Sequence, residues 1–243
     1  MVTGAGKRIG RDVALRLGRE GFAVAVHYGA SRSEAEAVAQ AIRAAGGQAA
    51  TVNADLAEPE ALGGLARDAA RKIGPLTLLV NSAAIFEGDG VDALDLALWR
   101  RQFAINLEAP VFLAAAFAKA LPDGVEGAIV NVIDHRVLRL NPRNLSYTLS
   151  KSALWTATQT LAQALAPHIR VNAIGPGPTY PNARDGAAGL AFEAKGVPLQ
   201  RRVSGEDIAD AVVYLAGARA VTGQLIAVDA GQHLGWRTPD VED

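Results

Sequence analysis

The chain has 243 residues, half of them hydrophobic, with a formal net charge of -1 and no cysteine. This length suits one large α/β domain better than two small ones, and the near-neutral charge predicts neither nucleic acid nor an anionic membrane as a partner. Disulfides and thiolate catalysis are excluded. Four histidines without an H-E-x-x-H motif give no reason to expect a metal site. We see no apolar run long enough to span a bilayer and no secretory signal, so we expect a cytoplasmic protein.

The first residues enter a glycine turn almost at once. Such a turn normally follows a full buried strand, yet only Met1, Val2 and Thr3 precede Gly4. Either the first strand is a stub or the natural chain begins upstream, and the sequence leaves both open. An amphipathic helix is expected from Arg11 to Glu20.

Apolar runs and helical stretches alternate along the rest of the chain. Strands are expected at residues 22–28, 49–54, 76–80, 128–133, 169–174 and 224–228, and helices at 34–45, 58–73, 95–120, 147–167 and 205–216. Because the strands are apolar throughout, they indicate a parallel sheet with helices on both faces. Right-handed crossovers then give a single doubly wound, Rossmann-like α/β domain over residues 1–243, with about seven strands.

The glycine turn is a candidate nucleotide site. Gly4, Gly6 and Gly10 would let the backbone approach a pyrophosphate, while the next helix points its N-terminus at the negative charge. An ordinary tight turn is the alternative. Lys7 and Arg8 lie in the turn itself, and two cations at a phosphate site favour a cofactor that carries an extra phosphate.

The end of the second strand distinguishes the two nicotinamide cofactors. A site for NAD normally has Asp or Glu there to hold the ribose hydroxyls, whereas this chain has His27 and Tyr28, followed by Ser31 and Arg32. No carboxylate stands at this strand end to repel a 2′-phosphate, and Ser31 and Arg32 could bind one, so we expect NADPH. Asp55, after the third strand, could meet the adenine amino group or cap the following helix.

A tyrosine and a lysine lie four positions apart, at Tyr147 and Lys151, in a stretch with helical character. Both side chains therefore leave one face of the helix. An ammonium ion nearby favours the phenolate, so we expect Lys151 to lower the pKa of Tyr147 toward the range of a proton donor. The pair alone also fits a surface lysine beside a half-buried tyrosine, unless a nucleotide site lies upstream.

Several motifs stand in the order found in the short-chain dehydrogenases/reductases, which the chain resembles over almost its whole length. They are Thr3-Gly4-x-x-x-x-x-Gly10, Asn81-Ser82-Ala83-Ala84, Asn106, Tyr147-x-x-x-Lys151 and Gly175-Pro176-Gly177. The resemblance implies a nicotinamide cofactor, Tyr147 as proton donor, Lys151 as its tuner and ribose ligand, and Asn106 as organiser of a water-linked proton relay. It also implies a homotetramer or dimer built on the long fourth and fifth helices.

Two departures from the family pattern point to one branch of it. Arg8 replaces the usual third glycine of the turn, and Asp134 replaces the usual catalytic serine. With Lys-Arg in the turn, His-Tyr ending the second strand and Phe86 after the fourth, the chain resembles the pteridine reductases, including dihydromonapterin reductase types. The resemblance implies that Phe86 and the nicotinamide sandwich a flat pterin and that Arg8 contacts phosphate and substrate, although Ala84 departs from a serine common there.

The carboxylate of Asp134 bears on the reaction itself. Reducing a ketone builds negative charge on oxygen, and a carboxylate at roughly 4 Å opposes that charge by about 4 kcal/mol at an effective dielectric near ~20. Reducing a C=N bond instead needs a proton at nitrogen, which Asp134 beside Tyr147 could relay while it hydrogen-bonds a pterin amino group. Alternatively, Asp134 only caps the following loop and Phe86 is a core aromatic. His135 and Arg136 are expected to be solvent-facing loop residues.

We therefore predict an NADPH-dependent oxidoreductase that transfers hydride to a C=N bond of a flat heterocycle, with a pterin as the best candidate. The alternatives are a short-chain carbonyl reductase acting on 3-oxoacyl-carrier-protein or small ketones, and a non-catalytic NADPH-binding regulator. The expected catalytic residues are Tyr147, Lys151, Asp134 and Asn106, and the expected substrate-binding residues are Arg8, Phe86, Asp134 and Tyr147. The expected cofactor contacts are Gly4, Gly6, Lys7, Arg8, Ile9, Gly10, His27, Tyr28, Ser31, Arg32, Asp55, Leu56, Asn81, Ala83, Tyr147, Lys151, Pro176 and Gly177.

Overall fold

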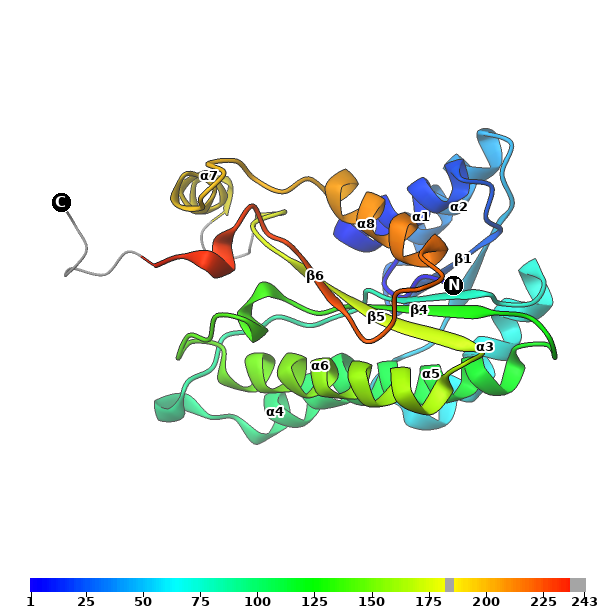
Figure 1. Cartoon of the computed structure of the whole chain (residues 1–243), viewed down its shortest axis with the longest axis horizontal. Helices are drawn as coiled ribbons and strands as arrows, with labels where there is room; N and C mark the ends of the chain where they lie inside the picture. Colours follow the sequence, from blue (N-terminus) through cyan, green and yellow to red (C-terminus); the bar gives the residue numbers. More distant parts are fainter. Residues whose placement is uncertain (182–185, 237–243) are drawn as a thin grey trace.

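A parallel sheet forms the centre of the molecule in the computed structural model, which describes residues 1–181 and 186–236 (Figure 1). In spatial order its strands are β2 (Ala49–Asn53), β1 (Val24–Tyr28), β3 (Leu78–Asn81), β4 (Gly127–Val132), β5 (Ile169–Pro176) and β6 (Leu225–Val228). Every pairing is parallel, and Val2 joins β1 to β3 through single bridges to Val26 and Val80. The described residues thus contain six strands rather than the expected seven, because the first is reduced to the bridge at Val2.

Helices cover both faces of this sheet (Figure 1). One face carries α1 (Arg8–Arg19), α2 (Arg32–Ala44) and α8 (Gly205–Gly217), and the other carries α3 (Pro59–Ile73), α4 (Leu96–Phe103), α5 (Ala109–Ala120) and α6 (Leu145–Leu165). The helix α7 (Gly186–Gly196) and four short segments, η1 (Val91–Ala93), η2 (Ala104–Glu108), η3 (His135–Val137) and η4 (Gln232–Leu234), complete the described part of the chain. The predicted doubly wound α/β fold is confirmed.

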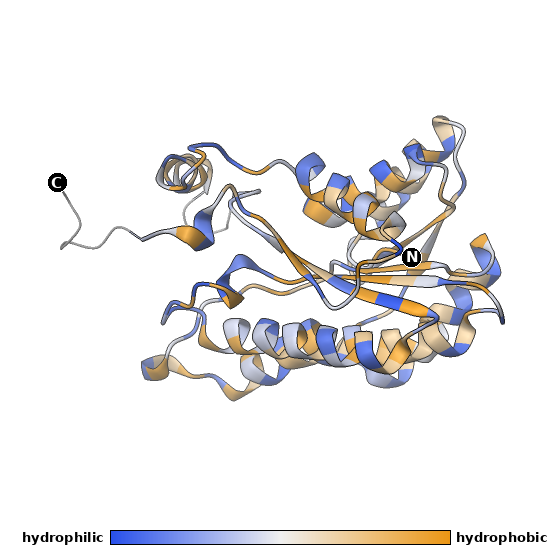
Figure 2. Ribbon diagram, in the orientation of Figure 1, coloured by the Kyte–Doolittle hydropathy of each residue, from blue (hydrophilic) through white to orange (hydrophobic). Residues whose placement is uncertain are grey.

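The core consists of two apolar layers, one on each side of the sheet. Successive strand residues alternate between them, so that Val80 and Val130 join the layer under α1 and α8, whereas Leu79 and Ile129 join the layer over α3 and α5. All four side chains are fully buried. Figure 2 shows the strands as largely hydrophobic ribbons between helices whose outer surfaces are more polar. This double burial explains why the strands read as continuous apolar runs in the sequence.

The predicted helix at residues 95–120 is interrupted. The Asp95 carboxylate caps α4 by accepting a hydrogen bond from the Leu98 N–H at 2.6 Å, and the π-helical segment η2 separates α4 from α5. The stretch Leu96–Ala120 is long and apolar enough to cross a membrane by length and composition, so the expectation that no run could do so was wrong. Its α5 part packs on α3 and on β3 and β4, and a core helix passes the same test.

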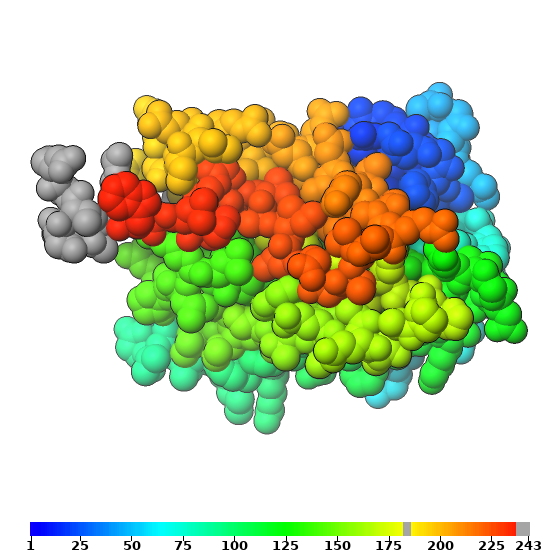
Figure 3. Space-filling view, viewed as in Figure 1, coloured from blue at the N-terminus to red at the C-terminus, as the bar shows by residue number. Residues whose placement is uncertain are grey.

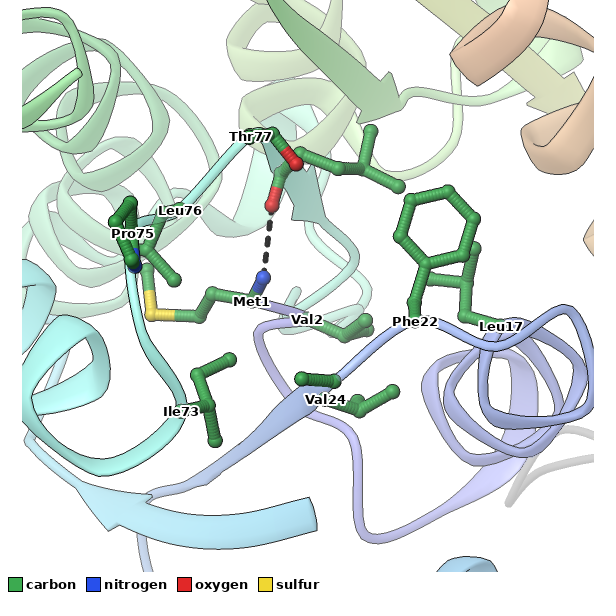
Figure 4. Close-up of a pocket in the computed structure, with 11 residues that line it drawn as sticks. Met1, Val2, Leu17, Phe22, Val24, Ile73, Pro75, Leu76 and Thr77 are labelled. Carbon is green, nitrogen blue, oxygen red and sulfur yellow. Dashed lines mark hydrogen bonds between the residues drawn. The ribbon is translucent and has the colours of Figure 1, made fainter. Parts of the chain in front are cut away.

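The glycine turn starts from very little strand. The Met1 ammonium donates a hydrogen bond to the Leu78 carbonyl at 2.7 Å and lies beside a cavity of about 90 Å³ that Leu17, Phe22 and Ile73 help to line (Figure 4). Burial lowers the pKa of this amine to about 5. Val2 nevertheless takes the central position of the sheet, so the turn begins at the carboxyl edge as a doubly wound fold requires.

Two late segments close one end of the molecule. Residues 186–200, gold in Figure 3, lie beside the C-terminal segment drawn in red, and the Leu199 N–H donates to the Ala230 carbonyl at 3.1 Å. Glu193 from the first segment and Gln232 from the second line the main cleft. These segments therefore form its outer wall.

Candidate active site

A cleft of about 930 Å³ opens at the carboxyl ends of the strands. The glycine turn, the ends of β1 and β2 and the loops after β3, β4 and β5 line it. Ligands of doubly wound sheets bind at this edge. Of the residues predicted from sequence, those that line the cleft are Gly4, Lys7, Arg8, Ile9, Gly10, His27, Ser31, Asp55, Leu56, Ala83, Phe86, Asp134, Tyr147, Lys151, Pro176 and Gly177. Gly6, Tyr28, Arg32, Asn81 and Asn106 do not line it.

The glycine turn is too tight for side chains. Gly4 has a φ of +62°, and a Cβ atom placed there would lie 2.9 Å from the Ala83 Cα. A Cβ atom on Gly10 would lie 2.4 Å from the Gly4 carbonyl oxygen. The Thr3 hydroxyl accepts hydrogen bonds from the N–H groups of Ser82 and Ala83, both at 3.0 Å, and so fastens the turn to the loop after β3. An ordinary turn needs neither glycine so strictly.

The N-terminus of α1 faces the cleft, since Lys7, Arg8, Ile9 and Gly10 line it. Its N-cap residue is Lys7, which makes no side-chain cap, and its first turn has no acidic residue. Helix N-termini attract anions because their first N–H groups lack intrahelical acceptors. Lys7 and Arg8 add positive charge, and both line the cleft. These residues therefore fit the pyrophosphate of a dinucleotide.

His27 fastens the glycine turn through a hydrogen bond to the backbone of Gly4. Its Nδ1 accepts a hydrogen bond from the Gly4 N–H at 3.1 Å, and its Nε2 lies 3.1 Å from the Ala54 carbonyl, to which the neutral tautomer donates. The imidazole is 2% exposed, and its burial lowers its pKa to about 4. The predicted contact of His27 with the cofactor stays a prediction; the structure shows that His27 links the turn to the ends of β1 and β2.

The half of the cleft that the glycine turn and the ends of β1 and β2 line also includes Ser31, the residue before α2. Ser31 lines the cleft, whereas Arg32 does not. The Lys7 ammonium lies 2.7 Å from a carboxylate oxygen of Glu34 in the first turn of α2. This carboxylate, which the sequence analysis did not consider, partly neutralises Lys7. Asp55 lines the cleft, and its Oδ1 accepts from the Ala57 N–H, but it does not cap α3, whose N-cap residue is Glu58.

Tyr147 and Lys151 project from α6 into the other half of the cleft, as their spacing predicts. The Lys151 ammonium donates to the Val132 carbonyl at 2.8 Å and lies 5.9 Å from the centre of the Tyr147 ring. Burial lowers the pKa of Lys151 to about 8. Burial also raises the pKa of Tyr147 well above its usual value, and the charge and hydrogen bond of Asp134 raise it further. The expected lowering of the Tyr147 pKa is therefore wrong.

Asp134 accounts for this difference. Its Oδ2 accepts a hydrogen bond from the Tyr147 hydroxyl at 2.9 Å, and its Oδ1 accepts from the Arg136 N–H, also at 2.9 Å. The carboxylate thus caps η3, as the alternative predicted, and also accepts the phenol; its predicted part in catalysis stays a prediction. The Arg136 guanidinium donates to both carboxylate oxygens, at 3.0 and 3.1 Å.

Phe86 and Arg136 complete this end. The Phe86 ring meets the Tyr147 ring edge to face at 4.7 Å, and the Arg136 guanidinium lies 5.1 Å from the Phe86 ring centre. Phe86 is 44% exposed and lines the cleft, so it is not a core aromatic. The expectation that His135 and Arg136 face solvent was wrong. His135 is buried and its Nδ1 bonds the Pro176 carbonyl, while Arg136 turns back over Asp134.

Comparison with known proteins agrees with this geometry. A family model described as enoyl-(acyl carrier protein) reductase matches residues 4–233. The chain belongs to the short-chain dehydrogenase/reductase family. It is 50% identical to the FolM alternative dihydrofolate reductase 1 of Brucella suis, solved in complex with NADP, with a TM-score of 0.96 and coverage of 99% of this chain and 97% of that one.

Two further relatives are named for less specific or different activities. An uncharacterised oxidoreductase of Methylorubrum extorquens is 37% identical over 239 residues, which cover 95% of this chain and 96% of the relative. A 3-oxoacyl-[acyl-carrier-protein] reductase, FabG, of Staphylococcus aureus is 32% identical over 245 residues, which cover 96% of this chain and 97% of the relative. This short-chain dehydrogenase/reductase is therefore an oxidoreductase, and its substrate has to be argued from the site.

In this short-chain dehydrogenase/reductase, the helix α6, which carries Tyr147 and Lys151, is held by residues that sequence reasoning missed. Both carboxylate oxygens of Asp89 accept from the Ser146 N–H, at 3.1 and 3.2 Å, at the N-terminus of α6. The Ser146 hydroxyl in turn accepts from the buried Gln102 side chain at 2.8 Å. Asp89 therefore caps α6 from another loop, which no local capping pattern could reveal.

Two predicted residues serve the architecture. The Asn106 side chain bonds the backbone N–H and carbonyl of Ile85 and the hydroxyl of Ser150, so it holds the loop that carries Phe86. The Asn81 side chain donates to Asn131 on the neighbouring strand at 2.8 Å. Their predicted functional roles stay predictions.

Arg8 contacts the loop that follows β5. Its guanidinium donates to the Pro181 carbonyl at 2.9 Å and lies 5.4 Å from the ring centre of Tyr180, whose hydroxyl donates to Asp12. The residue has a φ of +51°, in the left-handed region where the family usually has glycine. Its predicted contacts with phosphate and substrate stay predictions.

Proposed function

We propose that this protein is an NADPH-dependent reductase that transfers hydride to a C=N bond of a flat heterocycle of the pterin kind. The observation that carries the proposal is the 2.9 Å hydrogen bond from the Tyr147 hydroxyl to Asp134. It puts a carboxylate against the proton donor, where a ketone reductase has a neutral hydroxyl. The likeness to a FolM alternative dihydrofolate reductase solved with NADP supports the same substrate class.

NADPH, when bound, supplies the hydride. The glycine turn and the N-terminus of α1 suit its pyrophosphate, and Lys7, Arg8 and Ser31 suit its extra phosphate. Lys151 lines the cleft beside Tyr147, and we infer that it holds the nicotinamide ribose. Asp55 and Leu56 line the same cleft and suit the adenine end.

Tyr147 supplies the proton. Its hydroxyl is protonated at neutral pH, since the pKa of Tyr147 lies above its usual value, and the proton becomes available as negative charge develops on the ring nitrogen. Hydride adds to the carbon of the C=N bond, the nitrogen takes the Tyr147 proton, and a proton from solvent restores the phenol. The ring nitrogen ends neutral, so the Asp134 carboxylate beside Tyr147 meets no second anion on the substrate.

A carbonyl reductase is the second candidate, for two reasons. The FabG relative is 32% identical, and the Arg136 guanidinium bonds both oxygens of Asp134. This ion pair offsets part of the repulsion that the carboxylate would exert on a developing oxyanion. The charge argument therefore favours the heterocycle less strongly than an isolated Asp134 would.

The decisive experiment compares substrates. We would mix the protein with NADPH and either a dihydropterin or an acetoacetyl thioester, and follow the absorbance of the reduced nicotinamide. Turnover with the dihydropterin alone is the expected result, and turnover with the thioester alone would favour the carbonyl reductase. Turnover with neither, together with tight NADPH binding, would favour the non-catalytic regulator.

A variant sharpens this comparison. Asp134→Ser should reduce turnover of the dihydropterin and leave or increase turnover of the thioester, because it restores the neutral hydroxyl. Asp123→Ser, an exposed carboxylate in the turn after α5, is the matched control and should change neither. If Asp134→Ser instead favours the dihydropterin, the carboxylate is no reason to assign the heterocycle.

We also infer a cytoplasmic homo-oligomer, a dimer or a tetramer. Phe112 on α5 and Leu149 on α6 are 53% and 41% exposed, and the family resemblance places its interface on the long helices of this layer. Exposed large apolar side chains often mark such interfaces. Light scattering of the eluting protein measures the mass, and a monomer at micromolar concentration would contradict the inference.

A further inference from the structure

Arg136 has a buried donor for which the described part of the chain offers no acceptor. Its Nη1 bonds both oxygens of Asp134, but its Nε–H is buried and unpaired among the described residues. The guanidinium also lies against Phe86, and Arg136 and Phe86 both line the cleft. Buried donors are normally paired, so an unpaired one beside a ligand cleft points to a missing acceptor.

Asp134 cannot provide a free acceptor for the substrate while this arrangement lasts. Its Oδ1 accepts from the Arg136 N–H and Nη1, and its Oδ2 accepts from Nη1 and the Tyr147 hydroxyl. A carboxylate has about four such acceptor sites, so all are in use. Asp134 therefore has no acceptor site left for the predicted hydrogen bond to a pterin amino group, and the neighbouring Arg136 Nε–H is the group left to recognise the ligand.

We propose that Arg136 determines substrate specificity by donating its Nε–H to a carbonyl oxygen on the edge of the heterocycle. The inference rests on the proposed function and narrows it to heterocycles with a ring carbonyl next to Phe86. Arg136 holds Asp134 through its Nη1 and donates to the ligand through its Nε–H. An arginine suits this double contact because its donors are fixed in a planar fork.

A matched ligand pair tests the proposal by binding alone. The two ligands are 2-amino-4-oxopteridine, which offers the carbonyl acceptor, and 2,4-diaminopteridine, which has an amino donor there. We would measure both dissociation constants by fluorescence titration of the NADPH-bound protein. We expect Arg136→Met to raise the dissociation constant of the oxo ligand about tenfold or more, in line with loss of a charge-assisted hydrogen bond. The dissociation constant of the diamino ligand should change little.

Two further variants keep the result interpretable. Arg143→Met removes an exposed arginine from the loop before α6 and should leave both constants unchanged. Arg136→Lys keeps the charge but loses the fork, so it should also lose the preference for the oxo ligand; it carries the test if Arg136→Met does not fold. If both Arg136 variants keep the wild-type preference, the proposal is overturned, whereas failure to turn over any pterin would overturn the proposed function alone.

Discussion

The two halves of the cleft are built by different means. Backbone geometry forms the half at the glycine turn, where Gly4 and Gly10 allow the chain to fold back on itself. Hydrogen bonds of Thr3 and His27 fasten this turn. Side-chain charges form the half at Tyr147, where Asp134 bonds both Tyr147 and Arg136. The first half tolerates one residue type at each tight position, whereas the second half depends on which charged groups meet.

This difference sets how each half responds to change. A backbone turn fails when a side chain no longer fits, and it responds to pH only through the histidine beneath it. A charge cluster keeps its shape but changes its reactivity when one member is neutralised. Substitutions in the two halves should therefore affect different measurements, namely cofactor affinity and stability in the first and turnover in the second.

The largest effect should come from Tyr147→Phe in the charged half. It removes the proton donor while the ring stays against Phe86, so we expect turnover to fall about 100-fold or more. NADPH affinity, measured by fluorescence, should change little. Tyr214→Phe, at an exposed tyrosine of α8, is the control and should be silent. Equal losses of turnover and cofactor affinity would show that the two halves are not separable.

The next largest effect should be on stability, and it comes from His27, which bonds the glycine turn. His27 has a pKa of about 4 when folded and 6.5 as its ordinary value, so the folded chain holds fewer protons. Stability from this group is complete above pH 6.5 and is lost as pH falls toward 4, by up to about 3 kcal/mol. Urea unfolding at several pH values should show this loss in the wild type.

His27→Gln should remove that part of the pH dependence, because glutamine does not titrate. His168→Gln is the matched control, since His168 is exposed just before β5, and it should follow the wild type. Parallel curves for the wild type and His27→Gln between pH 7 and 4.5 would mean that the imidazole is not held neutral. The link between the turn and β2 would then need another explanation.

A third test adds a methyl group to the turn. Gly10→Ala puts a Cβ atom 2.4 Å from the Gly4 carbonyl oxygen, so the turn must shift. We expect NADPH affinity to fall about tenfold, because the N–H groups no longer aim at the phosphates. Gly63→Ala in α3, where a Cβ atom meets nothing within 4 Å, is the control and should be neutral or slightly stabilising. A wild-type affinity in Gly10→Ala would show that the turn is not the phosphate site.

The same contrast explains what the sequence could reveal. The glycine turn, the alternation of strands and helices and the Tyr147–Lys151 face follow from short-range spacing, and the structure has them, although α7 was not predicted and the helix expected at 95–120 is interrupted. The roles of Arg136 and Asp89 could not be read in this way. An arginine in a polar loop is usually solvated, and its return over Asp134 depends on the extended backbone of Asp134 and the turn of η3.

The error about the Tyr147 pKa has the same origin. Spacing correctly placed Lys151 on the Tyr147 face of α6, but the sign of the shift depends on burial and on the partner of the hydroxyl. That partner is Asp134, while the ammonium bonds the Val132 carbonyl. One signal was available: a carboxylate in the serine position is itself a candidate acceptor for the phenol. Applying it would have predicted a raised pKa.

The smallest effect should come from the rim of the cofactor half. Glu34 holds the Lys7 ammonium at 2.7 Å, and the pKa of this carboxyl is lowered to about 2, first of all by its hydrogen bond with Lys7. It is therefore ionised at neutral pH and competes with any phosphate for Lys7. Glu34→Gln should tighten NADPH binding by about two- to fivefold at low salt, and about 1 M salt should abolish the gain.

Glu36→Gln is the matched control, because Glu36 is an exposed carboxylate of α2 paired with Arg43 instead of the turn. It should leave the NADPH affinity unchanged at every salt concentration. Weaker binding in Glu34→Gln would mean that the ion pair holds Lys7 in a position that the phosphates need. The Glu34–Lys7 pair would then resemble the charged half of the cleft, where a carboxylate orients its partner. In that case only the glycine turn itself would depend on backbone geometry alone.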